Sequence, residues 1–175
     1  MTTLPEGSDR SDASIQGAKA EPSGLGGWLI LPALGLCLSP FIIAFSLYQT
    51  VQAIDTPGYG QLTNPASPRY NPLYKSFLIT EMAANVALIA FVLVTTVYFF
   101  RKHRLAPRLM ITFYIASFLI LVLDAALASW LLGVAIDKQS VKEIGRSVVT
   151  MAIWVPYFLV SKRVANTFGA AWTVI

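Results

Sequence analysis

Four long apolar stretches, separated by shorter polar segments, dominate the pattern of this 175-residue chain. A helix needs about 20 apolar residues to cross a hydrocarbon core of about 30 Å. The last stretch is apolar only from Val148 to Val160, so crossing requires that its helix begin near Ile144 and include Arg146. The pattern predicts an all-α integral membrane protein, a four-helix transmembrane bundle in one membrane domain (25–168), with spans at about 28–48, 77–100, 110–132 and 144–160.

The segments outside these spans are polar. Residues 1–24 are rich in Ser, Gly, Pro and acids, with too little apolar surface to offset the entropy of ordering, so we expect a disordered cytoplasmic tail. Residues 49–74 carry repeated X-Pro turn signals without helical periodicity. That external loop is either a cap folded over the outer face or slack, that is, a connection with no structure of its own. Residues 169–175 form a short C-terminal tail.

Composition supports a membrane protein and excludes an ordinary soluble domain. Hydrophobic residues make up 55% of the chain, charged residues 13%, and the mean hydropathy is +0.62. The net charge of +4 is small and the bases adjoin apolar spans, so membrane lipids, and no nucleic acid, are the expected partners. Cys37 is the only cysteine, which rules out an intramolecular disulfide and a cysteine zinc site within one chain; we expect it in the core.

The distribution of basic residues predicts the orientation. Four spans place both termini on one side, and the segments on that side carry eight bases against five on the other. The dense group between spans two and three decides the assignment, because basic clusters beside apolar helices stay in the cytoplasm. We therefore expect cytoplasmic N and C termini, with these topology and interface anchors: Arg101, Lys102, Arg104, Arg108, Lys162 and Arg163.

Two prolines inside the spans, Pro40 and Pro156, predict helix kinks. Proline removes a backbone donor and frees the carbonyl four residues earlier, which is Leu36 for Pro40. That carbonyl either lines a polar cavity or is satisfied by a neighbouring helix.

Two acids, one base and one amide inside the spans lie close to one depth. Asn85, Asp124 and Arg146 are each sixteen residues from a base at the cytoplasmic boundary, which places them about 24 Å above it. Glu81 lies one turn higher, on the same helical face as Asn85. The spacing therefore predicts a polar layer of Glu81, Asn85, Asp124 and Arg146 in the outer half of the bundle.

The chemistry of this polar layer allows two hypotheses. Charges at bilayer depth cost about 2.5 to 3.5 kcal/mol each on insertion scales, so they need partners, and Arg146 is the natural partner of Asp124 or Glu81. One base cannot neutralise two acids. The second acid is protonated, meets water or Lys142, or holds a cation, and the last three options require an opening toward the outer face. The layer is either a transport-associated pocket for a proton, cation or small polar ligand, or a buried ion-pair network that sets helix register.

Motifs for catalysis and cofactor binding are missing from the sequence. No Ser-His-Asp set, phosphate loop or HExxH motif occurs, so we expect no enzyme, no cofactor and no metal site. His103 is the only histidine, which excludes a bis-histidine haem in one chain, and we expect it to be solvated. The alternative function is an accessory or scaffold subunit that binds another membrane protein or a second copy of itself.

Two segments carry a family resemblance. The first is Gly26–Pro32 (GGWLILP), and the second is Ile153–Phe168 (IWVPYFLVSKRVANTF). Together they resemble the domain of unknown function 2569 family over about Gly24 to Phe168. The resemblance implies a small four-span protein of the bacterial inner membrane and implies no activity. It also implies a specified structure after span four, with Lys162 and Arg163 at the interface and Phe168 folded back on the apolar surface.

Overall fold

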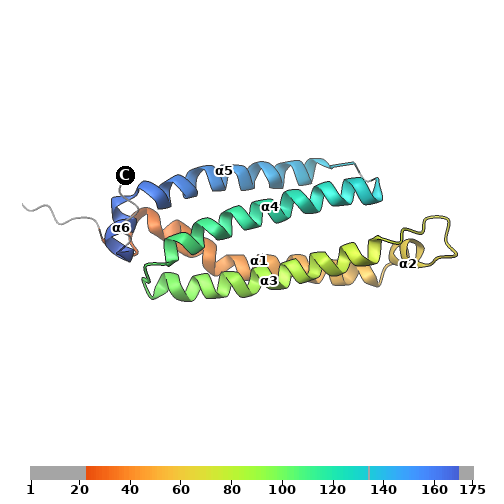
Figure 1. The fold of residues 1–175 in the computed structure, drawn as a ribbon, viewed down its shortest axis with the longest axis horizontal. Helices are drawn as coiled ribbons and strands as arrows, with labels where there is room; N and C mark the ends of the chain where they lie inside the picture. The colour runs from red at the N-terminus through yellow and green to blue at the C-terminus, as the bar shows by residue number, and fades with distance from the viewer. Residues whose placement is uncertain (1–22, 134, 170–175) are drawn as a thin grey trace, which may run out of the picture.

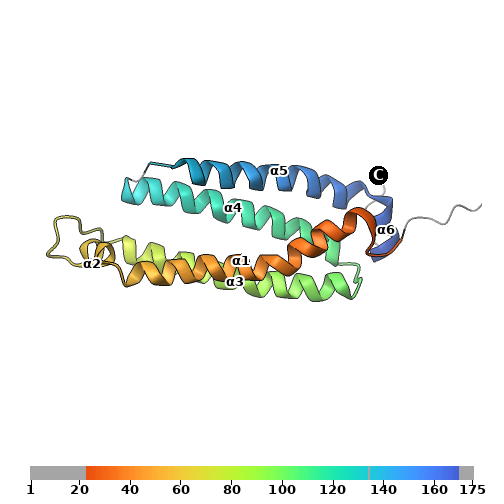
Figure 2. The same cartoon turned by 180° about the vertical axis from the view of Figure 1, so that it is seen from behind.

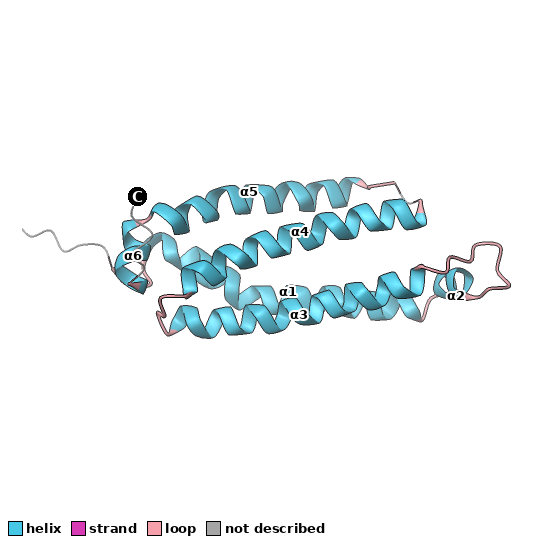
Figure 3. Ribbon diagram, viewed as in Figure 1, coloured by secondary structure: helices cyan, strands magenta, loops and turns pink. Residues whose placement is uncertain are grey.

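The computed structural model describes residues 23–133 and 135–169, and over these residues the chain is helical without strands (Figures 1 and 3). The predicted tails at 1–24 and 169–175 lie outside the described residues except for Ser23, Gly24 and Gly169. The elements are η1 (Gly27–Leu29), α1 (Ile30–Ile54), α2 (Pro57–Thr63), α3 (Tyr74–Phe100), α4 (Ala106–Leu132), α5 (Lys138–Val160) and α6 (Lys162–Phe168).

Four of these helices are long and apolar enough to cross a membrane: η1 with α1, then α3, α4 and α5. This confirms the predicted all-α fold and the four spans, and the protein is a multi-pass membrane protein. The described ends of the chain lie together beside α6, while α2 lies at the opposite end (Figure 1). We refer to these as the α6 end and the α2 end of the bundle.

The helices extend further at the α2 end than hydropathy predicts. Helix α1 continues past Tyr48 to Ile54, and α5 begins at Lys138 instead of Ile144. Asp137 caps α5, because its carboxylate accepts a hydrogen bond of 2.7 Å from the backbone N–H of Ser140. Polar residues in these extra turns lower the local hydropathy without interrupting the helix, which is why the predicted spans were too short.

The segment between α1 and α3 is folded, in contrast to the predicted absence of helical structure. It contains α2, which has Pro57 in its first turn, where a missing N–H costs nothing. The Asn71 side chain donates a 2.6 Å hydrogen bond to the carbonyl of Leu131, and its backbone N–H donates to Leu62. The connection is therefore tied to the end of α4 and is not slack.

The spans are arranged as two pairs. Helix α1 packs along α3 and α4 packs along α5, with α3 and α4 joining the pairs. The pairs meet near the α6 end and diverge toward the α2 end (Figures 1 and 2). Pro40 lies inside α1 and Pro156 inside α5, both helices continue through their proline, and α1 visibly changes direction along its length (Figure 2).

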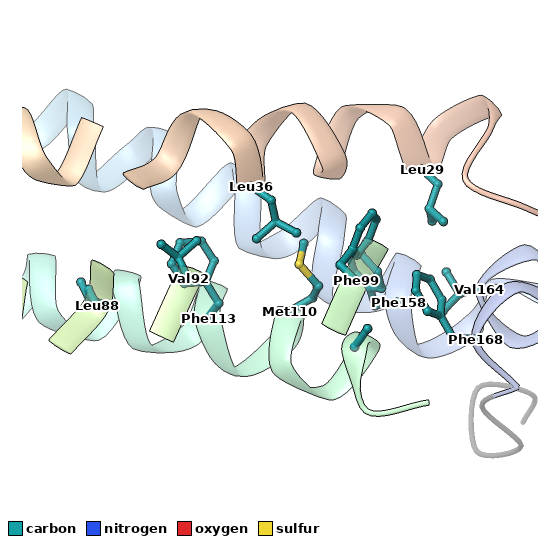
Figure 4. Packing of buried hydrophobic residues seen from close by; sticks show 11 residues of the cluster. Leu29, Leu36, Leu88, Val92, Phe99, Met110, Phe113, Phe158, Val164 and Phe168 are labelled. Atoms are coloured by element: carbon teal, nitrogen blue, oxygen red, sulfur yellow. The ribbon is translucent and has the colours of Figure 1, made fainter. Parts of the chain in front are cut away.

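The apolar core lies where the two pairs meet (Figure 4). Phe99 and Phe158 are fully buried there, and the rings of Phe99 and Phe168 have centroids 5.3 Å apart. The predicted return of Phe168 onto the apolar surface is confirmed, since only 2% of it is exposed. The buried cluster consists of Leu29, Leu36, Leu88, Val92, Phe99, Ala106, Met110, Phe113, Phe158, Val164 and Phe168.

The two segments that carry the family resemblance contact each other at the α6 end. The backbone N–H of Gly24 donates to Thr167 Oγ1 at 2.9 Å. A Cβ added to Gly27 would lie 2.7 Å from a guanidinium nitrogen of Arg163, so this side chain rests against the glycine backbone. Arg163 is thus half-buried, whereas the other five predicted anchors are exposed.

Replacing Phe168 by Ala should lower the free energy of unfolding by about 3 to 5 kcal/mol, because the change leaves a cavity against Phe99. Unfolding midpoints in detergent measure the loss. Phe41→Ala is the matched control, because Phe41 is 74% exposed on α1 and should lose less than about 1 kcal/mol. Equal losses in the two variants would show that Phe168 is not part of the packed core.

Gly27→Ala should destabilise the protein more than Gly133→Ala. Both glycines have a left-handed φ, +60° and +63°, which costs an L-residue roughly 1 to 2 kcal/mol. Only the Gly27 variant also displaces Arg163, since no atom lies within 4 Å of a Cβ at Gly133. In an Arg163→Ala background the two glycine variants should lower the unfolding midpoint equally, and an equal effect in the wild-type background would contradict the contact.

Candidate functional site

A polar cleft of about 450 Å³ lies between the two helix pairs, and all four spans line it. Leu88 and Phe113 of the apolar core form part of its wall. Most of the other residues that line it have polar side chains, which is unusual between membrane spans. We call this cavity the polar cleft; its polar lining residues are Ser39, Ser46, Glu81, Asn85, Tyr114, Ser117, Asp124, Glu143, Arg146, Ser147 and Thr150.

The four residues of the predicted polar layer all line this cleft. Glu81 and Asn85 share one face of α3, as their i, i+4 spacing requires. Together with Asp124 on α4 they are half-buried, whereas Arg146 on α5 is exposed. The tertiary structure therefore brings these four side chains, from three helices, to one cavity.

The predicted ion pair between Arg146 and a carboxylate is wrong for this structure. Within the described residues, Arg146 forms no ion pair with Glu81 or Asp124. Glu81 instead accepts a hydrogen bond of 2.9 Å from Thr50 Oγ1 on α1. For Glu81 the reason is geometric, because α1 is the direct neighbour of α3, whereas α5, which carries Arg146, packs against α4.

Glu143 is a cleft residue that the sequence analysis missed. It lies on α5 one turn before Arg146, so their i, i+3 spacing places both on one face. Its carboxylate accepts a 2.6 Å hydrogen bond from the Gln139 side chain. The sequence signal that could have placed Glu143 in the helix was Asp137, a residue type that caps helix N-termini. The hydrogen bond from Ser140 to Asp137 also lowers the pKa of the Asp137 carboxyl. With Glu143 included, three carboxylates and one guanidinium line the polar cleft.

Ser117 adds a hydrogen-bonding group to the wall of the polar cleft. Its hydroxyl oxygen is buried and has no hydrogen-bond partner in the described part of the chain. Buried polar atoms usually have a partner, so this hydroxyl is an exception beside the cleft.

A second cavity, of about 380 Å³, lies between α3 and α4 and is mainly apolar. Glu81, Ile120 and Asp124 line both cavities, so the two adjoin at these residues. Trp130, 77% exposed, and Leu123, 57% exposed, lie on its outer wall. We call this cavity the apolar groove; its other lining residues are Leu73, Ser76, Phe77, Thr80, Ala84, Leu127 and Leu131.

Two residues considered for other chemistry lie away from both cavities. Cys37 is exposed on α1, which corrects the expected core position. His103 is exposed between α3 and α4, and its Nδ1 accepts a hydrogen bond from the backbone N–H of Leu105. Its ring lies edge-on to that of Tyr98, with the two ring centroids 4.9 Å apart. Among the residues that the structure describes, no group of three or more His, Cys, Asp or Glu side chains is placed to hold a metal ion.

Comparison with known proteins gives a family and no activity. A family model described as "Protein of unknown function (DUF2569)" matches residues 22–169. Comparisons with curated proteins and with solved structures found no match. The family match covers all four spans, the polar cleft and the contact between the two ends of the chain, and the chain therefore belongs to the DUF2569 family.

Proposed function

We propose that this protein binds a small cation in the polar cleft and that it acts in transport across, or sensing at, a bacterial inner membrane without catalysing a reaction. The observation that carries the proposal is that Glu81 and Asp124 face a cleft in which Arg146 pairs with neither of them. The same carboxylates also suit the smallest cation, a proton.

The charge balance of the cleft supports a cation over an anion. Three carboxylates, on α3, α4 and α5, outnumber the single guanidinium of Arg146. In the described part of the chain the carboxylate of Asp124 accepts no hydrogen bond. A carboxylate at membrane depth is costly without a partner, and a bound cation would supply one.

The basic residues support an orientation with the α6 end in the cytoplasm. Arg101, Lys102, Arg104 and Arg108 lie in and next to the connection between α3 and α4, at the α6 end. The excess of bases on that side favours the cytoplasm under the positive-inside rule. The polar cleft then lies in the outer half of the bundle and receives its ligand from outside the cell or from the outer leaflet.

A second candidate function is an accessory subunit of another membrane protein or a homo-oligomer. The observation in its favour is that α5 is the least buried span and packs mainly against α4. Its uncovered face includes Val141, Val149 and Ile153, which offer an apolar surface to another helix or to lipid. Co-purification of a partner that is lost on substitution of Val149 and Ile153, with the cation affinity unchanged, would favour this function.

Cysteines placed in the polar cleft should react with a membrane-impermeant thiosulfonate reagent added from the outside. In a Cys37→Ser background, Ser46→Cys and Thr150→Cys test the wall of the cleft. Their neighbours, as Phe45→Cys and Val149→Cys, are the controls, because both face away from the cleft and are largely exposed toward lipid. We expect the cleft cysteines to react at least about tenfold faster, because the thiolate is the nucleophile that attacks the thiosulfonate sulfur and it forms where the cysteine meets water. Equal, slow reaction of all four would contradict a water-accessible cleft.

Glu81→Gln and Asp124→Asn should each weaken binding of tetramethylammonium by at least about tenfold, because each change removes one opposite charge from the site. Isothermal titration calorimetry on the protein in lipid nanodiscs measures the affinity. Asp55→Asn is the control, since Asp55 is an exposed acid after α1 and does not line the cleft. An unchanged affinity in both cleft variants, or a wild type that does not bind, would refute cation binding in the cleft.

A further inference from the structure

The geometry points to a single-tailed amphipathic cation as the ligand, with its charged head in the polar cleft and its apolar tail in the apolar groove. This inference rests on the proposed cation-binding function and adds the class of ligand. The feature that carries it is the junction of the two cavities at Glu81, Ile120 and Asp124.

Two carboxylates stand at this junction. Glu81 is on α3 and Asp124 is on the neighbouring α4, and each lines both cavities. The cleft side presents many hydroxyl, amide and charged groups among apolar side chains, whereas the groove side, apart from the two shared carboxylates, presents aliphatic and aromatic side chains with only Ser76 and Thr80 as polar members. A cationic head between the carboxylates is therefore next to a binding surface for an attached hydrocarbon tail.

Other classes of ligand match this pair of cavities less well. An inorganic cation uses only the polar cleft, and the described carboxylates are not grouped as metal ligands. A neutral alkyl compound fills the groove and leaves Glu81 and Asp124 without a counter-charge. A zwitterionic phospholipid brings a phosphate toward a cleft that three carboxylates line, and like charges repel. A molecule with one apolar tail and one positively charged head therefore matches both cavities.

The groove also offers a route from the bilayer. Ala84 and Thr80 are small side chains on its α3 wall, and they leave space between α3 and α4. Leu123 and Trp130 on the α4 wall are exposed on the surface that faces lipid. An amphiphile dissolved in the membrane can therefore approach the carboxylates sideways, with its tail still in an apolar environment.

The test compares tetramethylammonium with octyl- and dodecyltrimethylammonium on the full chain in lipid nanodiscs. After subtraction of binding to empty nanodiscs, we expect the affinity to rise at least about tenfold from the tailless to the dodecyl compound. Ala84→Phe fills the groove and should abolish this gain while the affinity for tetramethylammonium stays unchanged. Ala83→Phe is the matched control, because Ala83 is the exposed neighbour and lines neither cavity.

A second pair of variants does not depend on fitting a larger side chain. Leu123→Ser makes the groove polar and should also reduce the gain from the tail, whereas Leu119→Ser, one turn away and outside the groove, should not. The position of the tail is read from Trp130, left as the sole tryptophan by replacing Trp28, Trp154 and Trp172 with Phe. A bromine at the tip of the dodecyl tail should quench its fluorescence, and Ala84→Phe should prevent the quenching.

The outcomes separate the two proposals. If tetramethylammonium binds and the tail adds nothing beyond partition into empty nanodiscs, the amphiphile is refuted and the cation site stands. If tetramethylammonium does not bind, the cation site is refuted, and the amphiphile with it. If an uncharged dodecyl maltoside with the same bromine at its tail tip quenches Trp130 as strongly, and Glu81→Gln does not weaken binding of the cationic compounds, the groove binds only adventitious detergent and the inference is overturned.

Discussion

The packing of the two helix pairs at the α6 end is the interaction on which the rest of this structure depends. Phe99, Phe158 and Phe168 come from three different helices and are buried together there. In a bilayer, apolar faces gain little by leaving lipid, so close steric fit between such side chains must hold the pairs together. The contact of Gly24 and Gly27 with α6 closes the same end. Because this packing is concentrated at one end, the pairs are free to diverge toward the other.

That divergence makes a polar interior possible. A bundle packed tightly along its whole length would have to pair or neutralise Glu81 and Asp124 in a dry environment, which is costly. Here the two side chains instead line the polar cleft, and Glu81 keeps one direct partner in Thr50. The same divergence opens the apolar groove between α3 and α4, so that the carboxylates lie between a polar and an apolar cavity. A cation-binding function, and an amphipathic cation in particular, uses this juxtaposition.

The sequence by itself determined the membrane class, the number of spans and the set of polar residues that come together between the spans. These properties are local. The length of an apolar run identifies a span, and the constant rise per residue of a helix gives the distance along it between any two residues. The positions of Glu81, Asn85, Asp124 and Arg146 around one cavity follow from that arithmetic once three helices stand side by side. The family segments also predicted the return of Phe168 to the core.

Only the tertiary structure decided which helices are neighbours and therefore which polar groups meet. A lipid-facing side chain is as apolar as a core side chain, so a membrane span carries little periodic signal for its buried face. The sequence left Arg146 as the natural partner of an acid. In the structure α1 packs against α3, so Glu81 accepts its hydrogen bond from Thr50 instead. The sequence also left Glu143 outside the last predicted span, because hydropathy does not detect the polar turns of α5 that Asp137 caps. The apolar groove, which depends on the spacing of α3 and α4, was visible only in three dimensions.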